Sequence, residues 1–205
     1  MDQLDIDWTL RHQDDICNGK SATYYGIPIK KNPLDLWIYQ EIIHERKPEV
    51  IVEVGSWMGA SALFLADCQS RAGDGDVIAC DISPRPDACA PWAVDGIIWI
   101  QGDIAEASTL HTIRDEIGDK TCMVIHDAEH DAEPVLRDLR NLAPLVTVGQ
   151  YLIVEDGIID VWGAKPGPMH AIDTFLDTSK DFRADFARER YGITWNPCGY
   201  LERVR

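Results

Sequence analysis

The stretch Val50-Ile-Val-Glu-Val-Gly-Ser-Trp-Met-Gly-Ala-Ser-Ala-Leu-Phe-Leu-Ala66 decides the fold. Its first five residues form an apolar, β-branched run that only Glu53 interrupts, which is typical of a strand buried on both faces of a parallel sheet. The run breaks at Gly55, turns through Gly59 and continues as an apolar helix from about Ser61. This order predicts the first half of a nucleotide-binding α/β unit, in which the helix N-terminus presents unpaired N–H groups to a ligand.

The acid and the two glycines of this stretch are spaced Glu53-x-Gly55-x-x-x-Gly59, which is looser than the dinucleotide motif G-x-G-x-x-G. The spacing resembles motif I of the class I methyltransferases, which bind S-adenosylmethionine (SAM). The alternative is a purely structural turn, because any connection from a strand to a helix can carry two glycines.

Strand-like and helical segments alternate along the rest of the chain. We expect strands at 49–54, 77–81, 97–103, 122–127 and 151–156, and helices at 35–46, 108–117, 132–142 and 167–176. Residues 182–186 and 193–204 are expected to add an antiparallel pair, with Gly199 at a turn. The alternation predicts an α/β fold: a Rossmann-like, doubly wound, mainly parallel sheet with a C-terminal antiparallel strand pair.

The 205 residues suit one domain, because no internal repeat or linker divides them. Residues 1–35 are expected to form an N-terminal cap over the active site, with one short helix around Asp5–Cys17. Within this cap, the turn-rich segment Tyr24–Pro33 is expected to run as a loop over another surface.

The formal net charge of −16 argues against a nucleic-acid or anionic-membrane partner, because no basic run is present to meet phosphates. The acidic start of the chain lacks the apolar core of a signal peptide, and no apolar run is long enough to span a bilayer. The six cysteines lack C-x-x-C spacing, which argues against a disulfide framework or a zinc site. We therefore expect a cytoplasmic protein. We also expect it to be a homo-oligomer.

Acidic residues stand where four of the predicted strands end. They are Asp81, Asp103, Asp127 and the pair Glu155-Asp156. Ligands of an open parallel sheet bind beyond the carboxyl ends of its strands, so these acids should face one crevice. Carboxylates gathered there repel one another unless a cation or a hydrogen-bonding ligand offsets the repulsion. The pattern therefore favours a ligand site over a set of helix caps.

The position of each acid along the sheet suggests its role. Asp81 ends the strand after the glycine turn and suits a pair of hydrogen bonds to ribose hydroxyls, with a loop cap as the alternative. Asp103 stands where class I methyltransferases contact the adenine amino group, and loop capping is again the alternative.

Three further carboxylates meet if the fourth and fifth parallel strands are adjacent. They belong to Asp127, Glu155 and Asp156. Convergent carboxylates are hard oxygen ligands of the kind that Mg²⁺ accepts. We therefore expect a divalent metal here, and a surface charge cluster is the alternative.

Histidine close to these acids supplies a candidate general base. His130 follows Asp127 by three residues, while His126 and His170 are competitors for the role. A structural hydrogen bond is the alternative for His130. Trp57 and Trp162 could line the acceptor site, although tryptophans are first of all core residues.

Separated blocks over roughly residues 24–204 resemble the cephalosporin hydroxylase family, whose members have the class I SAM-dependent methyltransferase fold. The blocks are Gly26-Ile-Pro-Ile-Lys with Pro33-Leu-Asp-Leu, then Pro48 to Ala62, Asp127-Ala-Glu-His130, Val135 to Asp156, Gly167-Pro-Met-His-Ala-Ile and Gly199-Tyr-Leu-Glu-Arg-Val. The block Asp127-x-x-His130, together with Leu152-Ile-Val-Glu-Asp156, is the most specific part.

The resemblance implies a cofactor and a metal as well as a fold. It implies a SAM site around Glu53, Gly55, Ser61 and Asp81, and we expect Ser56 and Gly59 of the glycine turn and Asp103 at a strand end to contribute as well. It also implies Mg²⁺ or another divalent cation on Asp127, Glu155 and Asp156. The position of His130 beside these acids makes His130 and Asp127 the expected catalytic residues. Two departures stand out: His130 replaces the lysine base of catechol-type O-methyltransferases, and Ala60 replaces a frequent second glycine.

These observations predict a SAM-dependent, Mg²⁺-dependent O-methyltransferase that acts on a hydroxyl of a small natural product or its sugar. One alternative is an NAD-dependent oxidoreductase, which the missing G-x-G-x-x-G motif and the acid trio disfavour. The other is a non-catalytic SAM-fold binding protein, which would be free to lose those acids. The fold does not name the acceptor, because loops set its pocket.

Overall fold

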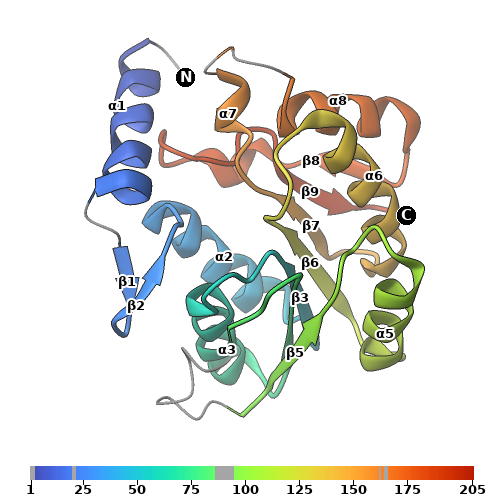
Figure 1. The fold of residues 1–205 in the computed structure, drawn as a ribbon. Helices are drawn as coiled ribbons and strands as arrows, with labels where there is room; N and C mark the ends of the chain where they lie inside the picture. Colours follow the sequence, from blue (N-terminus) through green and yellow to red (C-terminus); the bar gives the residue numbers. More distant parts are fainter. Residues whose placement is uncertain (1–2, 20–21, 86–94, 162, 164–165) are drawn as a thin grey trace.

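The computed structural model describes residues 3–19, 22–85, 95–161, 163 and 166–205. A seven-stranded sheet forms the centre, helices cover both of its faces, and a small hairpin lies beside it near the N-terminus (Figure 1). The Rossmann-like α/β architecture expected from the alternating segments is confirmed.

The strand order of the sheet is β5-β4-β3-β6-β7-β9-β8. The strands are β3 (Val50–Val54), β4 (Asp76–Asp81), β5 (Ile97–Gln101), β6 (Cys122–His126), β7 (Tyr151–Val154), β8 (Phe182–Ala184) and β9 (Tyr200–Arg203). The first five in this order are parallel, and β9 is antiparallel to both β7 and β8. The chain steps outward from β3 to β5 and then returns to the other side of β3 as β6. The topological switch point, where open α/β sheets bind ligands, therefore lies between β3 and β6.

The helices are α1 (Gln3–Asp14), α2 (Pro33–Arg46), α3 (Ala60–Ala72), α5 (Ala107–Ile117), α6 (Ala132–Leu142), α7 (Ile158–Val161) and α8 (Pro168–Thr178). Shorter turns are the π-helix η1 (Asp15–Gly19) and the 3-10 helices η3 (Ala143–Leu145) and η4 (Phe186–Glu189). Helix α2 shows how sequence sets the bounds. The Asn32 side chain accepts the N–H of Leu34 at 3.1 Å, and the helix ends at Lys47, in the left-handed region before Pro48.

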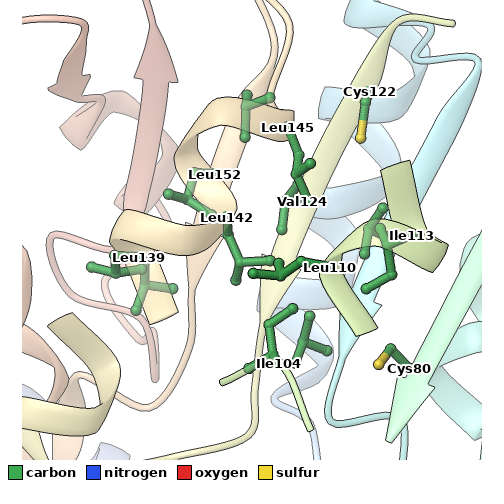
Figure 2. Close-up of a cluster of buried hydrophobic side chains, with 14 of the residues drawn as sticks. Cys80, Ile104, Leu110, Ile113, Cys122, Val124, Leu139, Leu142, Leu145 and Leu152 are labelled. Atoms are coloured by element: carbon green, nitrogen blue, oxygen red, sulfur yellow. The ribbon is translucent and has the colours of Figure 1, made fainter. Parts of the chain in front are cut away.

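Apolar layers hold both faces of the sheet. On one face, side chains of α5 and α6 such as Leu110, Ile113 and Leu142 pack on β6 and β7 at Val124 and Leu152 (Figure 2). On the other face, α2 and α3 cover the sheet with a second buried cluster that includes Ile38, Ile42, Leu65, Ile51 and Ile125. Because β3 is covered on both faces, all five of its residues are buried, as its continuous apolar run predicts.

The N-terminal segment contains a hairpin where a loop was expected. Strands β1 (Ala22–Tyr24) and β2 (Ile27–Ile29) pair antiparallel around Tyr25 and Gly26. Both turn residues have positive φ, 48° and 82°, the two-residue geometry whose twist matches that of paired strands. Ile27 and Ile29 are buried in a cluster with residues of α3, so the hairpin is fixed against the helix of the glycine turn.

The predicted elements otherwise differ mainly at their ends. The expected strand 97–103 stops at Gln101, and the expected strand 193–204 is reduced to β9. The predicted β8–β9 pair is confirmed, and Gly199 closes the turn before it by donating its N–H to the carbonyl of Asn196 at 2.9 Å. Part of the proline-rich loop after Ser83, as well as Trp162, lies outside the described residues.

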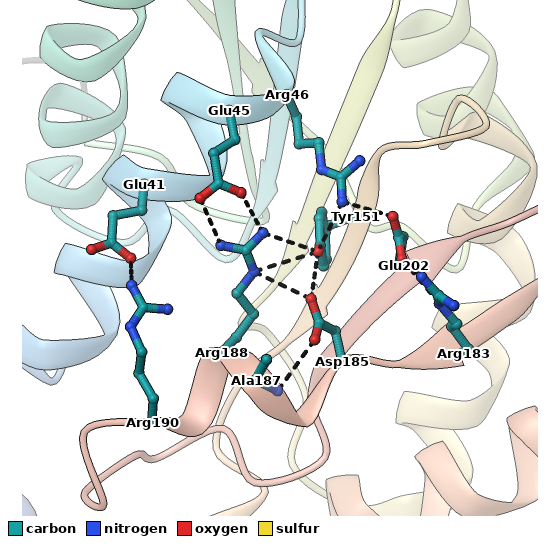
Figure 3. Close-up of polar contacts among 10 residues, drawn as sticks. All are labelled: Glu41, Glu45, Arg46, Tyr151, Arg183, Asp185, Ala187, Arg188, Arg190 and Glu202. Carbon is teal, nitrogen blue, oxygen red and sulfur yellow. Dashed lines mark hydrogen bonds and ion pairs between the residues drawn. The ribbon is translucent and has the colours of Figure 1, made fainter.

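Ion pairs connect α2 to the chain around β8 and β9, at the edge of the sheet that β8 forms (Figure 3). The residues of this edge network are Glu41, Glu45, Arg46, Tyr151, Arg183, Asp185, Arg188, Arg190 and Glu202. Arg188 binds both carboxylate oxygens of Glu45, at 3.2 and 2.6 Å, and Tyr151 donates its hydroxyl to Asp185 at 2.7 Å.

Candidate active site

The glycine turn after β3 brings the backbone close to the end of β6. Gly55 has φ of 93°, and a Cβ at this position would lie 1.9 Å from the carbonyl oxygen of Asp127. Only glycine fits here, because its backbone both enters the left-handed region and touches the neighbouring strand. Gly59 has φ of 79° and precedes the first turn of α3, so the N-terminus of that helix faces the carboxyl edge of the sheet.

Two cavities open along this edge. One has a volume of about 330 Å³ and is lined by N-terminal residues such as Cys17 and Pro28 together with Ser56 and Ser61. The other has a volume of about 340 Å³ and is lined at the ends of β4 and β5. Gly55, Trp57 and Asp127 line both cavities, so the glycine turn and the end of β6 form their common wall.

Asp81 and Asp103 line the second cavity, and each also makes the capping bond that was the alternative role. Asp81 accepts the N–H groups of Ser83 and Trp57, both at 2.8 Å. Asp103 accepts the N–H of Ala105 at 2.8 Å. A carboxylate offers about four acceptor positions, so these bonds leave both acids able to meet a ligand.

The acids at the ends of β3, β6 and β7 surround one buried cation. The ammonium of Lys31 lies 2.5 Å from Glu155, 2.6 Å from Asp127 and 3.5 Å from Glu53. Lys31 is only 4% exposed, and Glu53 and Glu155 are also buried. Lys31 follows β2 and was not among the predicted site residues, because nothing in its local sequence distinguishes it from a surface lysine.

Burial and mutual repulsion set the protonation of this cluster. Burial raises the pKa of the carboxyls of Glu53, Asp127 and Glu155, and the ammonium of Lys31 opposes that rise. Burial acts to lower the pKa of Lys31, but the neighbouring carboxylates outweigh it and hold that pKa well above its usual range. Lys31 is therefore charged, and one positive charge is shared among three acids.

The third expected metal ligand and the candidate base lie on the other side of Asp127. The Nε2 atom of His130 is 2.8 Å from Asp156 Oδ2, and this hydrogen bond raises the pKa of His130 against the effect of burial. Ligand atoms of Asp127, His130 and Asp156 all lie within 4.8 Å of one another. Asp156 has φ of 59°, a left-handed conformation that Asp tolerates better than most residues.

One expected metal ligand and both competitors of His130 lie outside the cluster of Asp127, His130 and Asp156. The side chain of Glu155 is held by Lys31, outside the cluster of Asp127, His130 and Asp156. Among the competitors of His130, His126 is buried and pairs with Asp138 at 3.1 Å, while His170 is exposed on α8.

The doubly wound sheet, the glycine turn and the acids at the switch point are the arrangement of nucleotide-binding α/β proteins, to which class I SAM-dependent methyltransferases belong, and comparisons with known proteins identify the family. The family model described as rhamnosyl O-methyltransferase/CmcI matches residues 18–204. The chain therefore belongs to this family, which confirms the resemblance to the cephalosporin hydroxylases.

Relatives in this family cover most of the chain. The rhamnosyl O-methyltransferase of Mycobacterium leprae (strain TN) is 33% identical over 196 residues, covering 89% of this chain and 83% of that protein. The rhamnosyl O-methyltransferase of Mycobacterium tuberculosis (strain H37Rv) is 32% identical over 194 residues, covering 89% and 78%.

Solved structures support the fold. A CmcI structure with Mg and SAM superposes with a TM-score of 0.70 at 22% identity, covering 92% of this chain and 78% of that one. The O-methyltransferase TomG of Streptomyces achromogenes, in complex with SAM, gives a TM-score of 0.59 at 14% identity, covering 90% and 82%. Among the described helices, none has the length and apolar character needed to cross a membrane.

Proposed function

We propose that this protein transfers the methyl group of SAM to a hydroxyl oxygen of a sugar, either free or carried by a small natural product. The observation that carries the proposal is the pair of cavities with a common wall at Gly55, Trp57 and Asp127. SAM can fill the second cavity and extend its amino-acid end past that wall into the first cavity, where the acceptor can occupy the remaining space. The rhamnosyl O-methyltransferases of the family support a sugar hydroxyl as the acceptor.

The residues around the glycine turn fit SAM. Asp81 and Asp103 line the second cavity and offer carboxylate acceptors for the ribose and adenine groups of a nucleoside. The hydroxyl of Ser56 is buried, lines the first cavity and has no hydrogen-bond partner among the described residues. A buried hydroxyl without a partner is costly, so Ser56 and the nearby N-terminus of α3, with Ser61, suit the polar amino-acid end of the cofactor. SAM supplies the reactive methyl group on its sulfonium.

The neighbouring acids fit a divalent cation. Asp127 and Asp156 would hold it, since their oxygens lie within one small cluster with His130. Glu155, the third ligand expected from the sequence, binds Lys31 through Oε1 and lies outside this cluster, so its side chain would have to turn toward Asp127 and Asp156 to join. Such a cation would supply a Lewis acid that makes an acceptor hydroxyl easier to deprotonate.

His130 is proposed to take the proton of the acceptor hydroxyl. Its bond to Asp156 keeps hydrogen on Nε2 and leaves the lone pair on Nδ1, the atom proposed to receive the proton. Cys17, Pro28 and Ile29 line the first cavity from the N-terminal segment, which supports the proposal that the described part of residues 1–35 is a cap that excludes water from it.

The proposal also covers the cellular location and the oligomeric state of the protein. We place the protein in a reducing cytoplasm, and the five described cysteines, all free thiols, support this. We also propose self-association, since Trp8 and Trp37 are more than half exposed on α1 and α2. Sedimentation velocity tests the second property.

Calorimetry and a methyl-transfer assay test the proposed reaction together. SAM should bind, and Asp81→Ala should weaken it by roughly 10- to 100-fold, because a carboxylate hydrogen bond contributes about 1.5–3 kcal/mol. Asp119→Ala, an exposed acid before β6, is the control and should leave affinity unchanged. With labelled SAM and a rhamnoside, the label should move to the sugar with Mg²⁺ and stop with EDTA.

Other outcomes point to other functions. Stabilisation by NADH but not SAM would indicate an oxidoreductase. Binding of SAM without transfer to any hydroxyl acceptor would indicate a binding protein.

A further inference from the structure

Lys31 is held in place by structure on both sides of it. Ile29, two residues before, is buried against α3, and Asn32, the next residue, caps α2 through its side chain. Asn32 also donates to Asp35 at 3.0 Å. The ammonium therefore reaches the acid cluster from a fixed backbone position, and its low exposure reflects the packing of the whole segment.

The contacts of Lys31 overlap with the proposed cation site. Its Nζ atom lies 2.6 Å from Asp127 Oδ2 and 2.5 Å from Glu155 Oε1. Asp127 belongs also to the cluster with His130 and Asp156. The carboxylate of Asp127 thus lies between two positions for positive charge, while Glu155 binds the lysine and is not part of the cluster with His130 and Asp156.

From this overlap we propose that Lys31 is a positioning residue that competes with the divalent cation for Asp127 and Glu155. Without the cation, the ammonium offsets the repulsion among the buried acids and keeps their carboxylates in place. When the cation binds, it takes over part of that role, and the hold of Lys31 on Asp127 and Glu155 weakens.

The competition links the metal to the cavity wall. Lys30 and Lys31 line the first cavity together with Pro28 and Ile29. A movement of the Lys31 ammonium would therefore change the wall of the cavity proposed to hold the acceptor. The inference rests on the proposed function only in that the function calls for a divalent cation. The same ammonium also lowers the affinity for that cation, since like charges near one site disfavour each other.

Lys31→Met tests the competition by direct metal binding without SAM or acceptor. Mn²⁺, followed by electron paramagnetic resonance, should bind the variant at least about tenfold more tightly than the parent, since one nearby charge shifts such equilibria by a factor of 10 or more. Lys31→Arg keeps the charge and should stay close to the parent. Lys120→Met is the matched control, because Lys120 pairs with Asp76 at 2.8 Å on exposed surface, and its Mn²⁺ affinity should not change.

Thermal melting supplies a second readout. Lys31→Met should melt at a lower temperature than the parent in EDTA, and Mg²⁺ should restore more of its midpoint than it adds to the parent. If the variant fails to fold in EDTA, folding in Mg²⁺ but not in Na⁺ of equal ionic strength is the expected result.

Unchanged or weaker Mn²⁺ binding by Lys31→Met would overturn the competition. An equal loss of thermal midpoint with and without Mg²⁺ would also overturn it, since Lys31 would then be only a structural cation. Calorimetry with SAM on the parent separates this failure from failure of the proposed function, because the parent would still bind SAM and methylate.

Discussion

The acid cluster around Lys31 and the edge network both gather charged side chains, but they balance the charge differently, and the edge network is the more exposed of the two. In the edge network four acids face four arginines, namely Glu41, Glu45, Asp185 and Glu202 against Arg46, Arg183, Arg188 and Arg190 (Figure 3). In the site four acids, Glu53, Asp127, Glu155 and Asp156, face one lysine and one histidine.

The difference separates structure from function. Charges that are matched within the fold hold segments together and need no partner from outside. A surplus of buried negative charge destabilises the folded state, and such clusters persist where the perturbed groups do chemistry. The site should therefore lose activity without losing stability when a surplus acid is neutralised, and the edge network should do the opposite.

The largest effect is expected for Asp156→Asn. Methyl transfer should fall on the order of 100-fold or more, because the variant loses a cation ligand and the partner of His130. Asn tolerates the left-handed backbone at this position, so the fold is kept. The thermal midpoint should hold or rise as repulsion is relieved, and SAM affinity should change by less than about threefold.

Glu202→Gln in the edge network is the matched control for that experiment. Glu202 is buried and binds Arg46 at 2.7 Å and Arg183 at 2.6 Å, so its loss should lower the midpoint and spare the rate. If Asp156→Asn instead melts early and keeps its rate, Asp156 belongs to the scaffold.

Arg188→Met should cause the largest loss of stability. The Arg188 side chain is 9% exposed and binds Glu45 and Asp185 near the hydroxyl of buried Tyr151. Glu45 is half exposed, so its ion pair is weak, but the buried partners lose hydrogen bonds. We expect a loss of about 2–3 kcal/mol in the free energy of unfolding, or a drop of roughly 5–10 °C in the midpoint.

Activity below the midpoint should stay within about twofold for Arg188→Met. Arg190→Met is its control, because the Arg190–Glu41 pair is more exposed and should contribute less than about 1 kcal/mol. Urea unfolding measures both losses. Equal losses in the two variants would mean that burial does not determine how much each arginine contributes to the free energy of unfolding.

Sequence reasoning could predict the parts of this molecule that depend on local pattern. The four β-branched apolar residues of β3, Gly55 and the acids after the strands define the sheet and its active edge, because burial and the switch point follow from order along the chain. The hairpin turn at Tyr25-Gly26 carried a usable signal, a glycine in a two-residue turn between β-forming residues.

The arrangement of the acids needed the three-dimensional structure. Successive residues leaving a strand point to opposite sides, so Glu155 and Asp156 could not be assumed to share one ligand. Glu155 turns to Lys31, while the left-handed backbone at Asp156 aims it at His130. Lys31 and Asp127 are 96 positions apart in the sequence, so no local pattern encodes their contact.

Asp35 offers the smallest and most specific test of how buried acids are balanced. Its carboxylate is buried and accepts hydrogen bonds from neutral donors: Asn32, Thr194, the backbone of Trp195, and Tyr200. Burial raises the pKa of Asp35 to about 6, although these bonds oppose the rise. Asp35 is thus an intermediate case: it is a buried acid like those of the site, but its hydrogen-bond partners are neutral donors.

The direction of the pH effect follows from that raised pKa. The folded protein binds the Asp35 proton more tightly than the unfolded chain, so this stabilisation is complete below the unfolded pKa of about 4 and is lost as the pH rises through about 6. Urea unfolding from pH 4.5 to 7.5 should show the parent losing on the order of 2 kcal/mol relative to Asp35→Asn. Thr194→Val removes a donor that lowers the pKa, so it should move this transition to higher pH. If the difference in free energy of unfolding between the parent and Asp35→Asn is constant across this range, the four donors stabilise the Asp35 carboxylate as fully as a cation would. Neutral donors would then balance a buried acid as well as the arginines of the edge network do.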